Sequence, residues 1–66
     1  MLYLEQLRRN ARLSQSKLAQ KADLHPSTVC SIINGNLNPY PSQLQKLADA
    51  LEYEGNPIGL LKEVKG

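Results

Sequence analysis

Apolar residues recur at helical spacing in the first part of the chain. Leu4, Leu7 and Ala11 follow an i, i+3, i+7 pattern, which predicts a helix over about residues 3–12. Ser14 is a favourable N-cap residue, so a second helix of about two turns is expected to begin directly after it. The pattern therefore favours short helices whose apolar sides meet in a common core.

Residues 26–34 predict a third helix whose two sides differ in kind. Pro26 suits the first helical position, and Gly35 suits the left-handed position that follows the last turn. One side carries Thr28, Val29, Ile32 and Ile33, and the other carries Pro26, Ser27, Cys30, Ser31 and Asn34. A solvated helix side normally carries Lys, Glu, Arg or Gln. Because the second side has only short, uncharged residues, it is able to approach a flat or grooved partner closely.

The remainder of the chain predicts a loop and two further helices. Residues 36–41 are rich in Asn and Pro, which predicts an irregular loop. Ser42 and Gln45 form a capping-box pattern ahead of a leucine-rich helix, and Asn56 followed by Pro57 predicts a short final helix. The expected fold is all-α, with five short helices.

The length and the single cysteine limit the class of protein. Sixty-six residues form one small domain, residues 1–66, and the initial Met and the lack of a linker suggest a complete protein. Cys30 has no cysteine partner, which excludes an intramolecular disulfide. No stretch resembles a signal peptide or approaches the roughly 20 apolar residues of a membrane span. We therefore expect a cytoplasmic protein without a membrane partner.

The net charge of +2 says little, but the charges are unevenly distributed along the chain. Residues 1–46 contain six Lys and Arg and two Asp and Glu, whereas residues 47–66 contain two and four. A basic front and an acidic back would orient the molecule toward a polyanion. A chance distribution of so few charges explains the same counts.

The residues for catalysis or for a metal site are missing from the sequence. The chain has one His and one Cys, His25 and Cys30, without a third residue placed to orient a base. One His and one Cys do not complete a zinc site, and no Gly-rich phosphate loop is present. We expect no enzymatic activity, no cofactor and no small-molecule substrate, and we expect Cys30 to be a passive small residue on the outer side of its helix.

Residues 13–51 carry a long series of marks at fixed spacing. The marks are Gln15, Leu18, Ala19, Ala22, Leu24, Ser27, Thr28, Val29, Ile32, Asn34, Gly35, Pro39, Leu44, Leu47, Ala48, Ala50 and Leu51. In order and spacing they resemble the helix-turn-helix of the phage repressor and Cro family, also called XRE-type regulators. The resemblance implies a compact five-helix DNA-binding domain like that of the phage repressors, with the third helix in the major groove.

The resemblance also implies roles for single residues. Pro26, Ser27 and Ser31 match positions that face bases. Gln15 matches a glutamine that contacts phosphate, which we favour over the alternative of a solvated first-turn residue.

Four further residues match backbone-contacting positions but have structural explanations too. Thr28 reaches a phosphate or packs inward. Asn34 contacts a phosphate, but helix termination accounts for it without DNA. Asn36 and Asn38 occupy a loop that grips the DNA backbone in the family, or they are simply solvated. Relatives often carry Lys or Arg in this loop, so we expect a reduced salt dependence here.

Two departures from the family pattern affect the expected site. Ile33 stands where relatives often carry an acid that pairs with an arginine, here Arg8. Without that acid we expect Arg8 to be free to contact phosphate, and Ile33 to join the core or to expose an apolar spot. His25 replaces the usual Ser or Thr N-cap, so we expect the start of the third helix to be held less firmly.

The sequence thus predicts a DNA-binding transcriptional regulator, a repressor that binds a pseudo-palindromic operator as a homodimer. The candidate dimer residues Tyr53, Ile58, Leu61 and Val64 serve equally well to close the core. The alternative is a protein-interaction module of the antitoxin or adaptor kind, with the small side of the third helix docked on a protein. Salt separates the two, because contacts to phosphates weaken steeply with salt and a small apolar interface does not.

Overall fold

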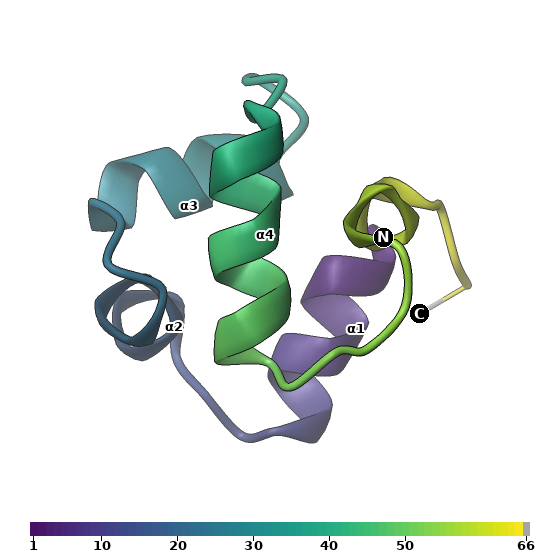
Figure 1. Cartoon of the computed structure of the whole chain (residues 1–66), viewed down its shortest axis with the longest axis horizontal. Coiled ribbons are helices and arrows are strands. Elements are labelled where there is room, and N and C mark those ends of the chain that lie inside the picture. The colour runs from purple at the N-terminus through teal and green to yellow at the C-terminus, as the bar shows by residue number, and fades with distance from the viewer. Residues whose placement is uncertain (66) are drawn as a thin grey trace.

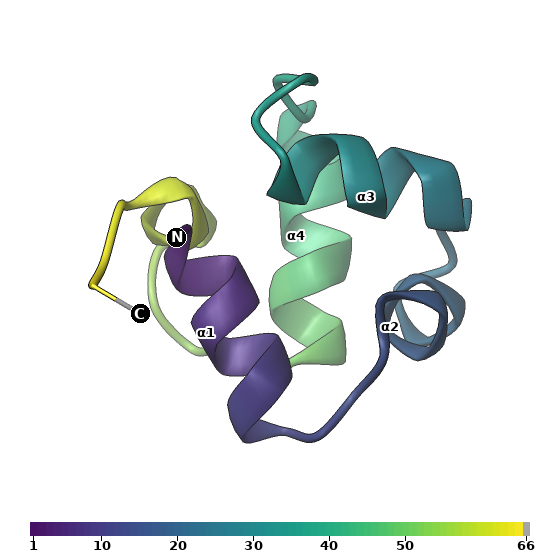
Figure 2. The ribbon, with the colours of Figure 1, turned by 180° about the vertical axis from the view of Figure 1, so that it is seen from behind.

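The computed structural model describes residues 1–65, which form four α-helices and a terminal 3-10 helix. The elements are α1 (Tyr3–Asn10), α2 (Gln15–Lys21), α3 (Pro26–Ile33), α4 (Pro41–Ala50) and η1 (Pro57–Leu61). α4 runs through the middle of the molecule, with α2 and η1 on opposite sides of it (Figure 1). Seen from behind, α3 crosses the N-terminal half of α4 (Figure 2). The expected all-α fold is confirmed, but the last element is a 3-10 helix.

Side chains from every element meet in one core. Its members are Leu4, Leu18, Ala19, Ala22, Val29, Ile32, Leu44, Leu47, Ala48, Ala50 and Leu60. Leu24, in the corner between α2 and α3, and Ile33, at the end of α3, are partly buried and pack against this core. Ile33 therefore joins the core, which decides between the two alternatives that the sequence left open.

Two of the expected helix starts are confirmed. Ser14 Oγ accepts a hydrogen bond from the backbone N–H of Lys17 at 3.0 Å, at the start of α2. Asn56 Oδ1 accepts from the backbone N–H of Ile58 at 3.1 Å, at the start of η1. Each side chain satisfies an N–H group that has no partner within its helix.

The expected start of α4 is wrong by two residues. The helix begins at Pro41, and the Gln43 side chain accepts from the backbone N–H of Tyr40 at 2.9 Å. The cause is Pro41, because proline fits the first turn and holds the residue before it in an extended conformation. The Ser42 and Gln45 pattern therefore does not cap the helix.

All four α-helices end in the same way. The residue after each C-cap has a positive φ, at Arg12 (59°), Asp23 (57°), Gly35 (79°) and Glu52 (56°). The next N–H donates back to the carbonyl five residues earlier, from Leu13, Leu24, Asn36 and Tyr53, at 2.8–3.1 Å. This arrangement is the Schellman motif, which favours glycine at the left-handed position. Gly35 fills that position as predicted, whereas α1 ends at Asn10 because Arg12 is already left-handed.

Replacing Glu52 with glycine is expected to stabilise the protein by about 0.5–1 kcal/mol. The left-handed conformation costs a non-glycine residue about 1–2 kcal/mol, and part of the gain is lost to the greater freedom of glycine in the unfolded chain. Urea denaturation measures the difference. Gly35→Ala is the matched control of opposite sign, because open space surrounds the added Cβ and only the φ of 79° opposes it. A loss of stability in Glu52→Gly would contradict the assignment of strain to this position.

The two ends of the described chain lie side by side next to η1 (Figure 1). Leu2 and Glu63 form an isolated antiparallel bridge, and the Tyr3 N–H donates to the Lys62 carbonyl at 2.7 Å. These contacts hold the segment after η1 against the start of α1. None of the helices within residues 1–65 has the length and apolar character needed to cross a bilayer.

Candidate functional site

α3 presents its small residues to solvent. Val29 and Ile32 are buried, with 0% and 1% of their surface exposed, whereas Pro26, Ser27 and Asn34 are exposed. Figure 2 shows the helix lying across the outside of the molecule, without another described element over it. The expected division of this helix into an inward apolar side and an outward small side is confirmed.

The start of α3 is capped by a histidine. His25 Nδ1 accepts a hydrogen bond from the backbone N–H of Ser27 at 3.2 Å and lies 2.7 Å from Ser27 Oγ. The expectation of a loosely held start is therefore wrong, because an imidazole nitrogen accepts at the N-cap as a serine oxygen would. The signal for this cap in the sequence is His25, whose ring nitrogen can accept a hydrogen bond directly before Pro26.

Residues 22–25 form the short corner between α2 and α3. Ala22 is the C-cap of α2, Asp23 takes the left-handed conformation, and Leu24 packs against the core. α2 and α3 also pack against each other. The first turn of α2 is thereby held at a fixed position relative to the exposed side of α3.

The other expected site residues on and beside these helices are placed as follows. Gln15 is the first residue of α2 and is half-buried, as are Thr28 and Ser31 on α3. Asn36 and Asn38 are exposed in the loop after α3. Pro26, Ser27 and Ser31 share the outward side of one helix, so the structure brings the three proposed base-facing residues together.

Asn34 and Cys30 interact with each other on the outward side of α3. Asn34 is the C-cap residue, and its Nδ2 donates to Cys30 Sγ at 3.4 Å. The contact runs from one helical turn to the next, so it accounts for both residues locally. This favours helix termination as the explanation of Asn34.

Arg8 is not free, which corrects the expectation from the sequence. Its Nε donates to Glu5 Oε1 at 2.5 Å, its Nη1 donates to the Leu13 carbonyl at 2.5 Å, and its side chain is only 15% exposed. Arg9 Nη2 lies 3.5 Å from the other oxygen of the same carboxylate. Position 33 on α3 has no acid to pair with Arg8. Glu5, which lies one turn before Arg8 on α1, provides the carboxylate instead. The contact with the Leu13 carbonyl also ties the end of α1 to the segment before α2.

The pair changes the titration of both groups. The hydrogen bond from Arg8 lowers the pKa of Glu5, and the charges of Arg8 and Arg9 add to this effect, while burial opposes it. The same hydrogen bond raises the pKa of Arg8. Both effects favour the ionised form of the pair, so the Arg8 guanidinium is already occupied by Glu5.

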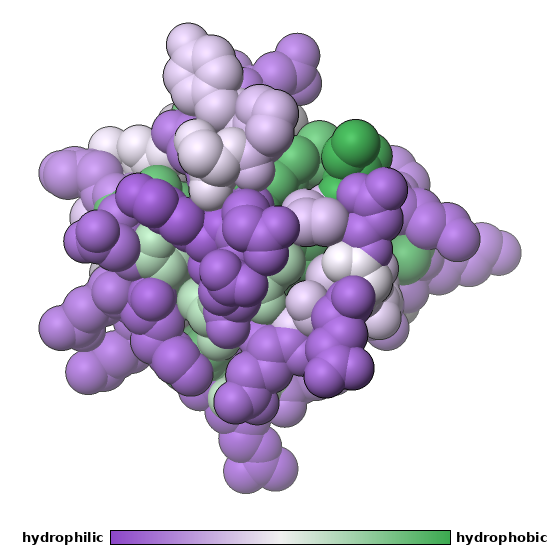
Figure 3. Space-filling model, viewed as in Figure 1, coloured by the Kyte–Doolittle hydropathy of each residue, from purple (hydrophilic) through white to green (hydrophobic). Residues whose placement is uncertain are grey.

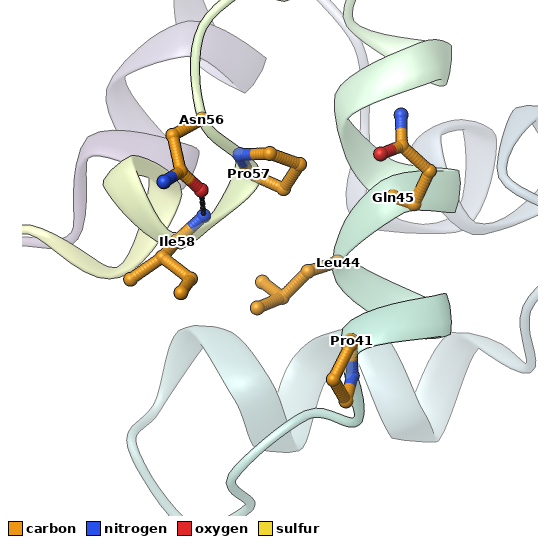
Figure 4. Close-up of a pocket in the computed structure, with 6 residues that line it drawn as sticks. All are labelled: Pro41, Leu44, Gln45, Asn56, Pro57 and Ile58. Carbon is orange, nitrogen blue, oxygen red and sulfur yellow. Dashed lines mark hydrogen bonds between the residues drawn. The ribbon is translucent and has the colours of Figure 1, made fainter.

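A second surface feature lies between α4 and η1. Pro41, Leu44 and Gln45 of α4 face Asn56, Pro57 and Ile58 across a groove with a volume of about 210 Å³ (Figure 4). A hydrophobic patch is visible beside the N-terminal end of α4, on the side of η1 (Figure 3). Ile58 is 66% exposed at this groove and Tyr40, which the sequence analysis did not single out, is 71% exposed.

The four candidate dimer residues thus separate into two groups. Tyr53 stacks edge-on against Tyr3, with ring centroids 5.8 Å apart, and Leu61 packs against the core. Val64 is half-buried, and its N–H donates to the Met1 carbonyl. Ile58 is the member of the group that is mostly exposed.

A comparison with protein-family models gives a match to a family described as helix-turn-helix, over residues 4–56. The matched segment contains α2, α3 and α4 completely and nearly all of α1. Neither the curated proteins nor the solved structures contain a match to the chain. Among residues 1–65, no three His, Cys, Asp or Glu side chains are grouped to hold a metal ion.

Proposed function

Because the chain belongs to the XRE-type helix-turn-helix family of DNA-binding transcription regulators, we propose that it represses transcription by binding a specific duplex operator through α3. The observation that carries this proposal is the exposed, uncharged side of α3, which has no long side chain to hold the helix away from base edges. An α-helix fits the major groove of B-DNA. We place this binding in the cytoplasm, where the bound protein would exclude other proteins from the operator.

Base contacts are assigned to the outward side of α3 and phosphate contacts to its surroundings. Pro26, Ser27 and Ser31 face bases, where a hydroxyl pairs with a base edge and an apolar atom contacts a thymine methyl. Phosphates are assigned to Gln15, Thr28, Asn36 and Asn38, whereas Asn34 is assigned to the end of α3. Since α3 carries no Arg or Gln that would form a bidentate contact, water bridges and DNA shape supply much of the discrimination.

The electrostatic part of binding is expected to be small for a DNA-binding protein. Arg8 and Arg9 both face Glu5, so part of their charge is neutralised within α1. The loop residues Asn36 and Asn38 contribute dipoles rather than charge. Fewer released counterions give a shallower dependence of affinity on salt.

Selection of bound sequences from random duplexes tests this function. An enriched two-fold symmetric motif is the expected result, and affinity for it should fall with rising salt while an unrelated duplex binds more weakly. A chain that selects no motif, or whose binding to a protein is insensitive to salt, would instead act as a protein-interaction module.

Binding as a homodimer follows from the small size of the module. A single domain of this kind offers little interface, and two-fold dimers of helix-turn-helix proteins contact half-sites about 34 Å apart. The molecule measures 26 × 24 × 23 Å, which allows two copies to touch on one side of the duplex. Ile58 beside the groove between α4 and η1 suits a two-fold contact, in which each copy supplies both a protruding side chain and a recess.

Replacing Ile58 with aspartate is expected to weaken dimerisation and operator binding together, by about tenfold or more, because a carboxylate would be buried in an apolar contact. Sedimentation equilibrium measures the first effect, and binding to a full operator and to a half-site measures the second. Gln20→Asp adds the same charge on the exposed side of α2, across the molecule from η1, and should leave dimerisation unchanged. Equal effects of the two variants would exclude Ile58 from the dimer contact.

A further inference from the structure

His25 and Ser27 are joined by two contacts to one ring nitrogen. The Ser27 N–H donates to His25 Nδ1 at 3.2 Å, and Ser27 Oγ lies 2.7 Å from the same atom. Both residues are exposed at the start of α3. The position of the hydroxyl proton of Ser27 therefore depends on which nitrogen of the His25 ring carries a proton.

The backbone contact assigns the ring proton. A peptide N–H is only a donor, so Nδ1 must offer its lone pair, and the proton of the neutral ring belongs on Nε2. With this tautomer, the 2.7 Å contact is a hydrogen bond that the serine hydroxyl donates, and the single lone pair of Nδ1 accepts both contacts. Ser27 has one hydroxyl proton, and this proton is directed toward His25.

Only the lone pairs of Ser27 Oγ remain for an outside partner. In the major groove, the amino groups of cytosine and adenine donate hydrogen bonds, whereas guanine O6 and N7 and thymine O4 accept them. A serine without such a neighbour serves either kind of base. We propose, on the basis of the DNA-binding role proposed above, that His25 determines specificity by making Ser27 an obligate acceptor for the amino group of cytosine or adenine, so that base pairs are distinguished by the strand that carries this group.

His25 acts in this proposal through Ser27, so it is a positioning residue rather than a base contact. Its role as N-cap alone would affect the stability of α3 and the affinity for all duplexes alike. Its effect on Ser27 changes the preference at one base pair only. The two roles are therefore separable by experiment.

The test uses competition between operators that differ at one base pair, at one fixed pH. The base pair whose preference disappears in Ser27→Ala identifies the position that Ser27 contacts. At that position the wild-type protein should lose about three- to tenfold in affinity when a base analogue without the exocyclic amino group replaces the cytosine or adenine, as one neutral hydrogen bond allows. An affinity that is unchanged when this amino group is removed, or an unchanged preference in Ser27→Ala, would overturn the proposal.

Two substitutions of His25 separate capping from positioning. Glycine is tolerated at the N-cap, so His25→Gly should change the stability of α3 only slightly. Because this variant lacks Nδ1, the preference at this base pair should fall to within about twofold. His25→Asn retains a side-chain acceptor for the N–H and the hydroxyl, and should preserve the preference. Persistence of the wild-type preference in His25→Gly would show that the ring does not direct Ser27.

The ring can also be examined without DNA. ¹⁵N chemical shifts of the imidazole in the free wild-type protein should show the proton on Nε2 and a hydrogen-bonded Nδ1. A ring proton on Nδ1 would overturn the inference even if the protein binds its operator. Failure to bind any duplex, with the proton on Nε2, would overturn the DNA-binding role and with it the base selection.

Discussion

A glutamate in place of Ser31 is expected to reduce operator affinity by about a hundredfold or more. Ser31 lies on the outward side of α3, one turn and a half after the helix start. A carboxylate there would enter the groove between two phosphate backbones, and opposed like charges cost several kcal/mol, where about 2.7 kcal/mol corresponds to a hundredfold. Fluorescence anisotropy with a labelled operator at fixed salt measures the loss.

Two control variants separate charge placement from size and net charge. Ser31→Gln has nearly the same shape as the glutamate variant without its charge, and should lose far less affinity. Gln20→Glu adds the same charge on the exposed side of α2, where only the general electrostatic attraction changes. Similar losses in Ser31→Glu and Gln20→Glu would place the groove contact elsewhere on the protein.

Replacement of Arg8 with alanine is expected to destabilise the fold by about 2–3 kcal/mol. The change removes the hydrogen bonds to Glu5 and to the Leu13 carbonyl, and leaves the Glu5 side chain, which is 9% exposed, with Arg9 as its remaining partner. Removing one member of a buried pair costs more than the pair contributes, because the remaining charge stays desolvated. For a domain of this size, such a loss is a large part of the total stability.

Urea denaturation of Arg8→Ala and Arg9→Ala provides the comparison. Arg9 approaches the same carboxylate, but its side chain is 59% exposed, so its removal should cost less than about 1 kcal/mol. Equal free energies of unfolding for the two variants would show that the buried pair of Arg8 and Glu5 does not stabilise the fold more than the exposed Arg9 does.

The same pair predicts how stability changes with pH. Because the pKa of Glu5 is lower in the folded protein than its ordinary value of 4.5, the unfolded chain binds more protons between the two values. The stabilisation from Glu5 is complete above that ordinary value and is lost as the pH falls through the pKa of the folded state. Arg8→Ala should show a smaller loss of stability from Glu5 on acidification, measured by urea midpoints between about pH 7 and pH 3.

Much of the fold was predictable because local signals and the core agree. Ser14, Pro26, Gly35 and Asn56 each mark a helix boundary through their own backbone or side-chain chemistry, and the structure has a boundary at each of them. The buried sides of α2 and α3 followed from apolar spacing alone. Such positions carry their information within a few residues.

The errors arose where a residue had several possible partners. The sequence expectation considered position 33 as the partner of Arg8, whereas Glu5 at i−3 was available and nearly buried. Likewise, the ring nitrogen of His25 caps α3 in place of a Ser or Thr oxygen, and Pro41 takes precedence over Ser42 at the start of α4. In each case the competing interaction was local, but its strength depended on burial or backbone geometry that composition does not show.

The shortness of α3 sets how much DNA one copy reads. Eight residues span about 12 Å, and the duplex rises about 3.4 Å per base pair, so the helix faces three to four base pairs. A site of three to four base pairs recurs by chance roughly every 60–250 base pairs, so single copies of the protein would be distributed over many sites on a chromosome. In the proposed homodimer, two copies would read a longer sequence, and operator occupancy would rise with about the square of the protein concentration, so that the regulated gene would respond to a threshold.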